Sequence, residues 1–230
     1  MNRYNLQSYF TQLRFNEEQH KYTIDGKELT SVTTYVKKFI KPFDVFMMSH
    51  RVANSRKNRE LGLTAEYFRK YWKFKGEMAR SIGNITHFFA ESMPHFPEPS
   101  SPLEKAVIAF YEDIIKDKEV IEAKELMCYY KGLSGTVDLI TSDDKGLIIR
   151  DYKTSKDLNR SYGKMLAPFD SLKDSQLNQY SLQLLLYAYI IEKVTGNKAY
   201  KLEIVKLSDD GYEISQINEE VRTIFNELID

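Results

Sequence analysis

Cysteine is nearly absent from this 230-residue sequence. Because Cys128 is the only one, no disulfide can form within the chain, and an iron–sulfur cluster or a zinc site built from several thiolates is excluded. A single cysteine fits a reducing, cytoplasmic setting. The first fifteen residues also lack the continuous apolar segment of a secretory signal, and we expect no organellar targeting even though none of them is acidic.

Long apolar runs, glycine and proline are also scarce. The run LLLYAYII, from Leu184 to Ile191, is far shorter than the roughly 20 residues that span a bilayer, so we expect no membrane partner. With 10 glycines, 6 prolines and 42% hydrophobic residues, the composition is that of an ordinary globular protein without low-complexity tracts. We therefore expect one folding unit.

The whole chain has no excess of charge of one sign, but one segment has an excess of positive charge. The 33 basic and 33 acidic residues cancel, yet residues 37–80 contain twelve basic residues and only four acidic ones. The second half of this segment also contains the rings of Tyr67, Phe68, Tyr71, Trp72 and Phe74. Basic side chains interleaved with rings suit a nucleic-acid strand. The alternative is a solvated helix with a buried aromatic stripe, and the segment alone does not decide between the two.

Turn residues and hydrophobic periodicity predict the order of elements in the first half. KYTI and KELT flank Asp25-Gly26, a favoured tight-turn pair, and predict a hairpin. Ser31 can cap a helix over SVTTYVKKFI. Residues 44–93 have a mostly helical pattern up to the proline-rich loop MPHFPEPSSP, and another helix begins at Pro102.

The hydrophobic period then changes from helical to alternating. The stretches ELMCYY, SGTVDLIT and GLIIRDYKT predict three strands in a meander. A long helix over residues 174–194 ends at Gly196, the strands KAYKLEIVKL and YEISQI follow, and a last helix begins near Asn218. The order of helix, three strands, helix and strand predicts an α/β fold with a mixed sheet flanked by helices.

Two charged residues on the third strand require an explanation. Asp151 and Lys153 are two residues apart, so a strand projects both from one face, next to apolar neighbours. If the second and third strands pair around residues 142–145, Asp138 and Asp151 can meet. Two converging carboxylates suit a hard divalent cation such as Mg²⁺, and Lys153 would face the developing charge of a phosphate. The alternative is an Asp–Lys pair at a wet sheet edge.

Two helices carry further polar residues at helical spacing. His87 shares a helical face with Gly83 and Glu91 and can complete a metal site or position a phosphate. The alternative is a semi-buried histidine with Glu91 as its hydrogen-bond partner. On the later helix, Gln183 and Tyr187 share a face, and they either touch solvent or contact substrate and orient a catalytic group.

In this order, the motifs GTVD, DYK and QLLLY, preceded by G-x-x-x-H-x-x-x-E, resemble the PD-(D/E)XK nuclease superfamily. More narrowly, they resemble its RecB-like exonuclease branch, which includes phage-encoded and mitochondrial genome maintenance exonucleases. The hairpin followed by TSVTTYV resembles the start of those proteins. The resemblance extends from about residue 20 to residue 207. It implies the restriction-endonuclease-like core of that superfamily, which agrees with the order of elements above.

The resemblance also implies the roles of particular residues. The catalytic residues would be Asp138, Asp151 and Lys153. The metal ligands would be His87, Asp138, Asp151 and the main-chain carbonyl of Tyr152. The residues that bind substrate or orient the site would be Gln183, Tyr187, Glu91 and Glu125, with Glu122 competing for the place of Glu125. The cofactor would be one or two Mg²⁺ or Mn²⁺ ions, without an iron–sulfur cluster.

The expected protein is a metal-dependent exonuclease that hydrolyses phosphodiester bonds at DNA ends in the recombination, repair or processing of phage or cellular DNA. Its partner would be DNA that is single-stranded or has an end, guided by Arg69, Lys70, Tyr71, Trp72 and Lys73. Residues 1–75 would form the hairpin and the DNA-guiding subregion of a single nuclease domain, and residues 76–230 its core. The alternatives are a structure-specific or restriction-like endonuclease and a non-catalytic DNA-binding protein with a relic site.

Overall fold

The computed structural model describes residues 3–93 and 98–229. The chain divides into two compact units, which we call the sheet unit (residues 1–41 and 87–230) and the helical unit (residues 42–86). One long helix, α4 (Ala65–Ser92), contributes residues to both. No helix within the described ranges is long and apolar enough to cross a membrane.

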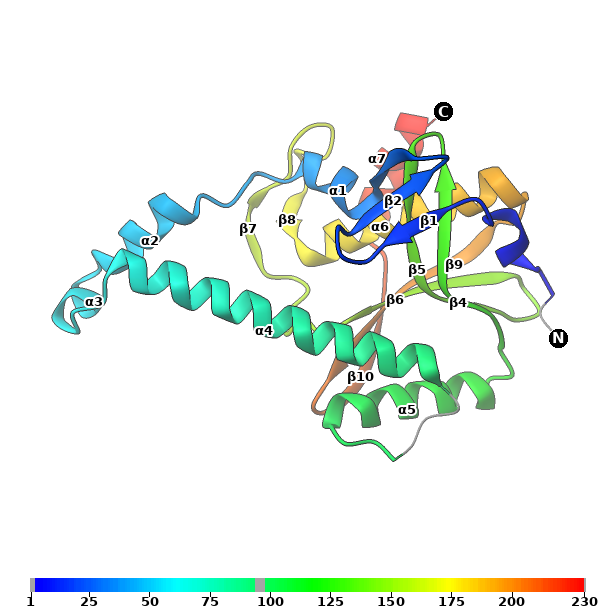
Figure 1. Ribbon diagram of the computed structural model, residues 1–230, viewed down its shortest axis with the longest axis horizontal. Helices are drawn as coiled ribbons and strands as arrows, with labels where there is room; N and C mark the ends of the chain where they lie inside the picture. The colour runs from blue at the N-terminus through cyan, green and yellow to red at the C-terminus, as the bar shows by residue number, and fades with distance from the viewer. Residues whose placement is uncertain (1–2, 94–97, 230) are drawn as a thin grey trace. The chain divides into compact units, whose positions relative to one another are not determined.

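An eight-stranded sheet forms the centre of the sheet unit (Figure 1). Its strands lie in the order β1 (Arg14–Asn16), β2 (Lys21–Ile24), β3 (Lys27–Ser31), β5 (Leu133–Ser142), β6 (Leu147–Lys153), β9 (Ala199–Ser208) and β10 (Gly211–Gln216), with β4 (Val120–Tyr130) also paired to β5. The pairs β3–β5 and β6–β9 are parallel, and the other pairs are antiparallel. The predicted mixed sheet is therefore confirmed.

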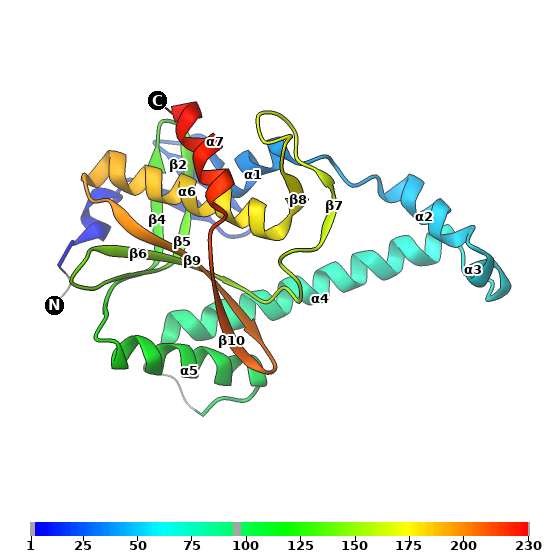
Figure 2. The same ribbon diagram turned by 180° about the vertical axis from the view of Figure 1, so that it is seen from behind.

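Helices cover both faces of this sheet, as Figures 1 and 2 show. On one face α6 (Gln176–Thr195) buries its apolar side, together with α1 (Val32–Val36), α7 (Glu219–Ile229) and the 3-10 helix η1 (Leu6–Tyr9). On the other face α5 (Pro102–Lys116) packs with the last residues of α4 in a second buried cluster. The order α5, β4 to β6, α6 and β9 matches the predicted helix, three strands, helix and strand.

The sheet forks at β5. Because β4 pairs along the whole of one edge of β5, both β3 and β6 must use the other edge. β3 pairs with residues 133–134 and β6 with residues 139–142. In the described part of the chain, neither strand pairs with residues 135–138 between them, which are the GTVD stretch. Backbone and side-chain groups at this fork must find other partners.

Local sequence features set several element boundaries as predicted. Asp25 and Gly26 adopt left-handed φ angles of 49° and 75° in the β2–β3 hairpin. The Ser31 side chain accepts a hydrogen bond from the Thr34 N–H and so caps α1. Gly196, with φ of 73°, ends α6.

Other boundaries differ from the prediction. α1 ends at Val36, and the 3-10 turn η2 (Lys37–Phe39) follows it. β4 begins at Val120, five residues before the predicted ELMCYY, because it pairs along the whole of β5. A small two-stranded sheet, β7 (Ser161–Lys164) with β8 (Lys173–Ser175), lies between β6 and α6 and was not predicted. Part of the predicted proline-rich loop, residues 94–97, lies outside the described residues.

The helical unit contains α2 (Val45–Ala53), α3 (Arg56–Glu60) and the first part of α4, in agreement with the helical pattern of its sequence. Asp44 accepts a hydrogen bond from the Met47 N–H and so caps α2. Arg69 on α4 donates to Ser49 Oγ (3.0 Å), and its guanidinium lies over the Phe46 ring. These contacts hold α2 against α4.

Candidate metal centre

His87 lies near the C-terminal end of α4, and that end is fixed within the sheet unit. Lys124, on β4, donates to the main-chain carbonyls of Glu91 and Met93. Tyr111, on α5, donates to another main-chain carbonyl of α4 at 3.0 Å. The last carbonyls of a helix have no partner within the helix, so these donors stabilise its end. His87 is thereby held in place beside β4 and α5.

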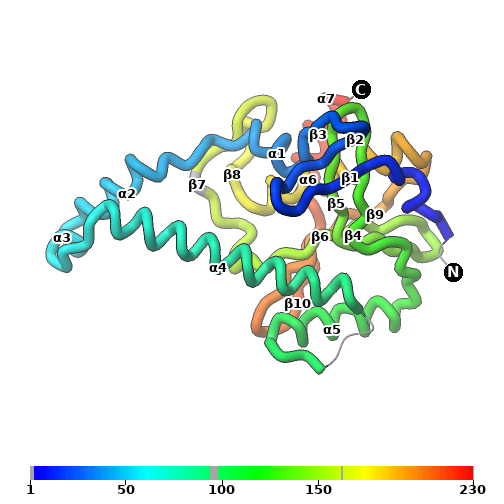
Figure 3. The backbone as a smooth tube through the Cα atoms, in the orientation of Figure 1, coloured from blue at the N-terminus to red at the C-terminus, as the bar shows by residue number. Residues whose placement is uncertain are grey.

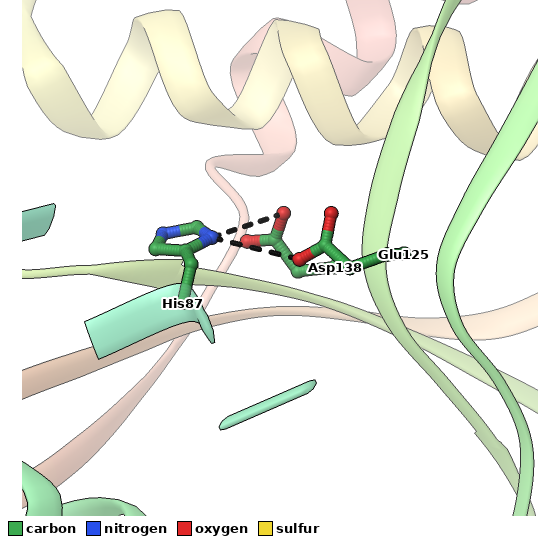
Figure 4. A group of neighbouring side chains, drawn as sticks. All are labelled: His87, Glu125 and Asp138. Atoms are coloured by element: carbon green, nitrogen blue, oxygen red, sulfur yellow. Dashed lines mark ion pairs between the residues drawn. The ribbon is translucent and has the colours of Figure 1, made fainter. Parts of the chain in front are cut away.

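Two carboxylates converge on His87 (Figure 4). A ring nitrogen of His87 and carboxylate oxygens of Glu125 on β4 and Asp138 on β5 all lie within 4.8 Å of one another. His87 Nδ1 is 3.6 Å from Asp138 Oδ1 and 3.8 Å from Glu125 Oε1. We call these three side chains the acidic cluster.

Glu125 has a backbone conformation that non-glycine residues rarely adopt. Its φ of 45° lies in the left-handed region, which costs roughly 1–3 kcal/mol when a non-glycine residue adopts it. Such a residue redirects its side chain from the regular strand pattern, and here the carboxylate points toward His87 and Asp138. The strain therefore accompanies the formation of the cluster.

Glu122 is the other acidic residue that the sequence offered for this position. Its carboxylate accepts hydrogen bonds from the Arg3 and Tyr4 N–H groups and from the Ser142 hydroxyl. These bonds hold the N-terminal segment beside the start of β4, as can be followed in Figure 3. Glu125, and not Glu122, therefore belongs to the acidic cluster.

The main chain of Tyr152 links His87 to Asp138. His87 Nε2 lies 3.2 Å from the Tyr152 carbonyl, and the Tyr152 N–H donates to Asp138 Oδ2 (2.7 Å). The first hydrogen bond needs a proton on Nε2, so the lone pair of a neutral ring is on Nδ1, the nitrogen that faces the carboxylates. The second hydrogen bond gives a partner to the Tyr152 N–H, which lies in the part of β6 that does not pair with β5. The Tyr152 carbonyl, a predicted metal ligand, therefore contacts His87 here.

Asp151 and Lys153 project from one face of β6, and Tyr152 projects from the other. Lys153 Nζ lies 2.5 Å from Asp151 Oδ2, and Gln183 on α6 donates to Asp151 Oδ1 (2.9 Å). Asp151 is only 2% exposed, so its charge depends on these two partners. Within the described ranges, Asp151 is not part of the acidic cluster.

Burial is the main reason that the pKa of both aspartates is raised, and a nearby carboxylate adds to it, Glu125 for Asp138 and Asp138 for Asp151. Burial is the larger cause for Asp138, whose pKa rises despite the nearby charges of His87 and Lys153. Burial also raises the pKa of Asp151 to about 6, against the effect of Lys153. Burial lowers the pKa of His87, but the negative charges of Asp138 and Glu125 outweigh it and raise the value to about 9.

These shifts indicate that additional positive charge would stabilise the acidic cluster. One imidazole nitrogen and two carboxylate oxygens form a donor set that a divalent cation accepts. A cation bound among them would favour the ionised carboxylates and the neutral imidazole, and so would lower the pKa values of Asp138 and His87. The residues present therefore fit a divalent metal ion.

Tyr187, one turn after Gln183 on α6, lies against β5 at the fork. A Cβ added to Gly135 would be only 2.7 Å from Cε1 of the Tyr187 ring, so the close approach of ring and strand requires glycine. Tyr187 is buried, and burial together with the negative charges of Asp151 and Asp138 raises its pKa well above the ordinary value. The glycine of GTVD and the tyrosine of QLLLY thus form one contact.

Replacing Gly135 with alanine should displace the Tyr187 ring and lower the free energy of unfolding by about 1–3 kcal/mol. Urea unfolding measures this loss. Gly163→Ala is the matched control, because a Cβ at that position meets no atom within 4 Å. Equal unfolding midpoints for the two variants would show that the contact does not matter.

Tyr180 is a neighbour of the site that the sequence analysis missed. Its ring centroid lies 4.6 Å from Lys153 Nζ, a cation–π distance, and its hydroxyl lies 3.3 Å from Ser155 Oγ. It precedes Gln183 by three positions and Tyr187 by seven, so the three side chains share one face of α6. This helical spacing is the feature of the sequence that could have identified Tyr180 as part of the site.

The other predicted site residues lie apart from the acidic cluster. Glu91 is exposed, and within the described ranges it is not one of the clustered acids. The predicted DNA-guiding residues all belong to the helical unit. Their contacts there include the ion pairs Lys70–Glu66 and Lys73–Glu77, the ring pairs Tyr71–Tyr67, Trp72–Phe43 and Trp72–Phe68, and the contacts of Arg69 with α2.

Comparison with known proteins identifies one family. The profile of the PD-(D/E)XK nuclease superfamily matches residues 50–228. No curated protein matches the chain. A solved structure described as "Crystal structure of SSO0001" is 16% identical, covers 65% of this chain and 85% of its own, and has a TM-score of 0.23, a score too low to support an argument about this protein.

Proposed function

Because the chain belongs to the PD-(D/E)XK nuclease superfamily, we propose that it is a metal-dependent exonuclease that hydrolyses phosphodiester bonds at DNA ends. Membership implies a nucleic-acid substrate, and the acidic cluster is a possible metal site. One observation carries the proposal: the cluster lies at the fork in the sheet, where the Tyr152 main chain joins it to the strand of Asp151 and Lys153.

In this proposal, each group at the fork has a distinct task. His87, Glu125 and Asp138 would hold Mg²⁺ or Mn²⁺, one or two ions, and Asp151 would be a further ligand. The cation neutralises phosphate charge and lowers the pKa of water when it is bound. The pKa of Lys153 is raised because Asp151 and Asp138 outweigh its burial, so the ammonium stays charged and stabilises the negative charge of the transition state.

The residues of α6 keep these groups in position. Gln183 fixes one oxygen of Asp151, so the other oxygen stays directed at Lys153. Tyr187 packs on Gly135, three residues before Asp138, and so supports β5 at the fork. Rigid support of this kind is what a catalytic site needs, because small displacements reduce the rate strongly.

The exonuclease activity and the RecB-like branch are proposed from the order of the motifs. The Gln-x-x-x-Tyr pair follows the GTVD and DYK strands, and its two side chains contact those same strands. The hairpin before TSVTTYV pairs with β5 at the start of the fork. Roles in recombination, repair or processing of DNA follow from the same proposal.

Digestion of linear DNA labelled at the 5′ or 3′ end, beside closed circular single-stranded DNA, tests this function in Mg²⁺ and in Mn²⁺. An exonuclease degrades the linear strands and leaves the circle intact. Nicked circles would instead identify an endonuclease. If neither substrate is cleaved in either metal, the protein is a non-catalytic binding protein.

We also propose that the helical unit guides the DNA strand. Its described residues include exposed rings next to basic side chains, among them Phe43, Phe46, Tyr67, Tyr71 and Phe74. Exposed rings stack on bases of any sequence, and basic side chains follow the phosphates. The ion pairs along α4 are solvent-exposed and therefore weak, so the lysines can exchange their partners for phosphates.

Replacing Tyr71 with alanine should weaken binding of single-stranded DNA about ten-fold, because stacking of one base contributes roughly 1–3 kcal/mol. Fluorescence anisotropy with labelled oligothymidine, with Ca²⁺ in place of Mg²⁺, measures the affinity. Tyr9→Ala is the control, since Tyr9 is similarly exposed (46% against 43%) but lies in η1 of the sheet unit. The same loss in both variants would argue against guidance by the helical unit.

A further inference from the structure

Tyr22, on β2 of the N-terminal hairpin, contacts the stretch of β5 that lies in the fork. Its hydroxyl is 2.9 Å from Thr136 Oγ1, and either oxygen can donate in this hydrogen bond. Thr136 belongs to the GTVD stretch and precedes Asp138 by two positions. Tyr22 and Thr136 are 114 positions apart in the sequence, so the tertiary structure alone brings the hairpin to the neighbourhood of the acidic cluster.

The position of the Tyr22 side chain is fixed by its neighbours in the hairpin. Tyr22 lies opposite Phe15 of β1 and Leu29 of β3, and the centroids of the Tyr22 and Phe15 rings are 4.6 Å apart. The hairpin is itself joined to β5 through β3, where Ser134 Oγ donates to the Thr30 carbonyl at 3.4 Å. Tyr22 is only 7% exposed. A ring packed in this way gives its hydroxyl a defined location.

Residues 135–138 need such a partner because the fork leaves one edge of β5 open. In the part of the chain that the structure describes, β3 pairs with β5 up to Ser134, and β6 pairs with it from Leu139 onward. The strand between these points lacks the backbone ladder that fixes its neighbours on that edge. Three contacts support it instead: the Tyr187 ring lies against Gly135, the Tyr22 hydroxyl bonds to Thr136, and the Tyr152 N–H donates to Asp138.

The hydroxyl of Tyr22 remains protonated beside the acidic cluster. Burial raises the pKa of Tyr22 more than the hydrogen bond with Thr136 lowers it, and the negative charges of Glu125 and Asp138 add to the rise. The phenol therefore keeps its proton at neutral pH, and its contact with Thr136 is a hydrogen bond between two neutral groups. Tyr22 brings no charge to the cluster, so any effect it has on the cluster comes from its position.

We propose that Tyr22 is a positioning residue for the candidate metal centre. Through Thr136 it holds the GTVD stretch of β5, so that the Asp138 carboxylate stays directed at His87 and Glu125. The inference rests on the metal site of the proposed function, and it gives the N-terminal hairpin a part in that site. Tyr22 acts on metal affinity through the backbone of β5, as residues that orient ligands do when they change metal affinity by roughly 10–100-fold.

Calorimetry with Mn²⁺, in the absence of DNA, tests the inference. Tyr22→Phe keeps the ring against Phe15 and removes the hydroxyl, and Thr136→Val keeps the branched shape of the side chain. Each change should weaken Mn²⁺ binding about ten-fold. The double variant should lose no more than either single variant, because both changes remove the same hydrogen bond. Thr136→Ser keeps a hydroxyl and should retain most of the affinity.

Tyr200→Phe is the matched control, because the Tyr200 hydroxyl also donates to a side chain, that of Asp143 in the turn between β5 and β6. This variant should bind Mn²⁺ as tightly as the wild type. A contact with a purely structural role would lower the melting temperatures of Tyr22→Phe and Thr136→Val and leave their Mn²⁺ affinities unchanged.

Wild-type Mn²⁺ affinity in both variants would therefore overturn the inference, even if the wild type digests linear DNA. Weakened Mn²⁺ binding in both variants, together with a wild type that cleaves no DNA in Mg²⁺ or Mn²⁺, would overturn the proposed function and leave the role of Tyr22 standing. A wild type that binds no Mn²⁺ would overturn both.

Discussion

Replacing Asp138 with asparagine should lower the rate of metal-dependent DNA cleavage about 10³-fold or more, because metal ions supply several kcal/mol of transition-state stabilisation. The amide oxygen of asparagine can still accept the hydrogen bond from the Tyr152 N–H, so the fork keeps its structure while the cluster loses a charged ligand. Single-turnover digestion in Mg²⁺ and in Mn²⁺ measures the rate, and calorimetry with Mn²⁺ should show that binding is lost.

The control for this variant is Asp144→Asn, the same chemical change at an exposed position of the β5–β6 turn. It should cleave at the wild-type rate. Melting temperatures of both variants should stay close to that of the wild type, which separates loss of the metal from loss of the fold. If D138N digests DNA as fast as the wild type in either metal, the acidic cluster is not the metal centre.

Replacing Arg150 with methionine should lower the free energy of unfolding by about 3–5 kcal/mol, because it removes the buried cation that Glu119 and Glu203 share and leaves Glu203 to its ion pair with the more exposed Lys201. Arg150 donates to Glu203 (2.6 Å) on β9 and, through two nitrogens, to Glu119 (2.6 and 2.8 Å) just before β4. The Arg150 and Glu203 side chains are only 3% and 2% exposed. Urea unfolding at pH 7 measures the loss, and Lys21→Met, which breaks an exposed pair with Glu28, should cost about 1 kcal/mol or less.

The Arg150 variant should also change the response to acid. Burial raises the pKa of Glu203, but Arg150 outweighs it and holds the value below 4.5. The pair therefore stabilises the wild type above that pH and is lost as the pH falls through the lowered pKa. Without the guanidinium, the pKa of Glu203 should rise, because the hydrogen bonds from Gln216 and Lys201 then oppose the effect of burial without the larger effect of Arg150. The variant regains stability as the carboxyl takes up a proton. The difference in unfolding free energy should shrink between pH 7 and pH 4, and a constant difference would contradict this account.

Much of the fold was predictable because its signals are local. The Asp25-Gly26 turn, the Ser31 cap and the Gly196 cap all depend on residues within a few positions of each other, and they set the boundaries as predicted. The common face of Asp151 and Lys153 follows from the strand period. The small β7–β8 sheet was missed because its short strands lack a hydrophobic pattern, and it is fixed by burial of nearby residues such as Phe169.

The site itself depended more on tertiary structure. From the sequence, Glu125 was the candidate at the start of the predicted strand ELMCYY, and Glu122, three residues earlier, competed with it. The left-handed backbone of Glu125 and its place opposite Asp138 decided between them. Tyr180 and Arg150 went unnoticed because their partners are distant along the chain. Lys153 lies 27 residues from Tyr180, and Glu119 and Glu203 lie 31 and 53 residues from Arg150.

By itself, the sequence determined the order of helices and strands, the spacing that places Asp151 with Lys153, and the spacing that places Gln183 with Tyr187. Periodicity and capping act over a few residues, so one chain segment contains all the information they need. Only the tertiary structure decided that β3 and β6 share one edge of β5, that the GTVD stretch lies in the fork between them, and that His87 reaches it from α4. These outcomes depend on strand pairing and helix packing between distant segments, which no local pattern specifies.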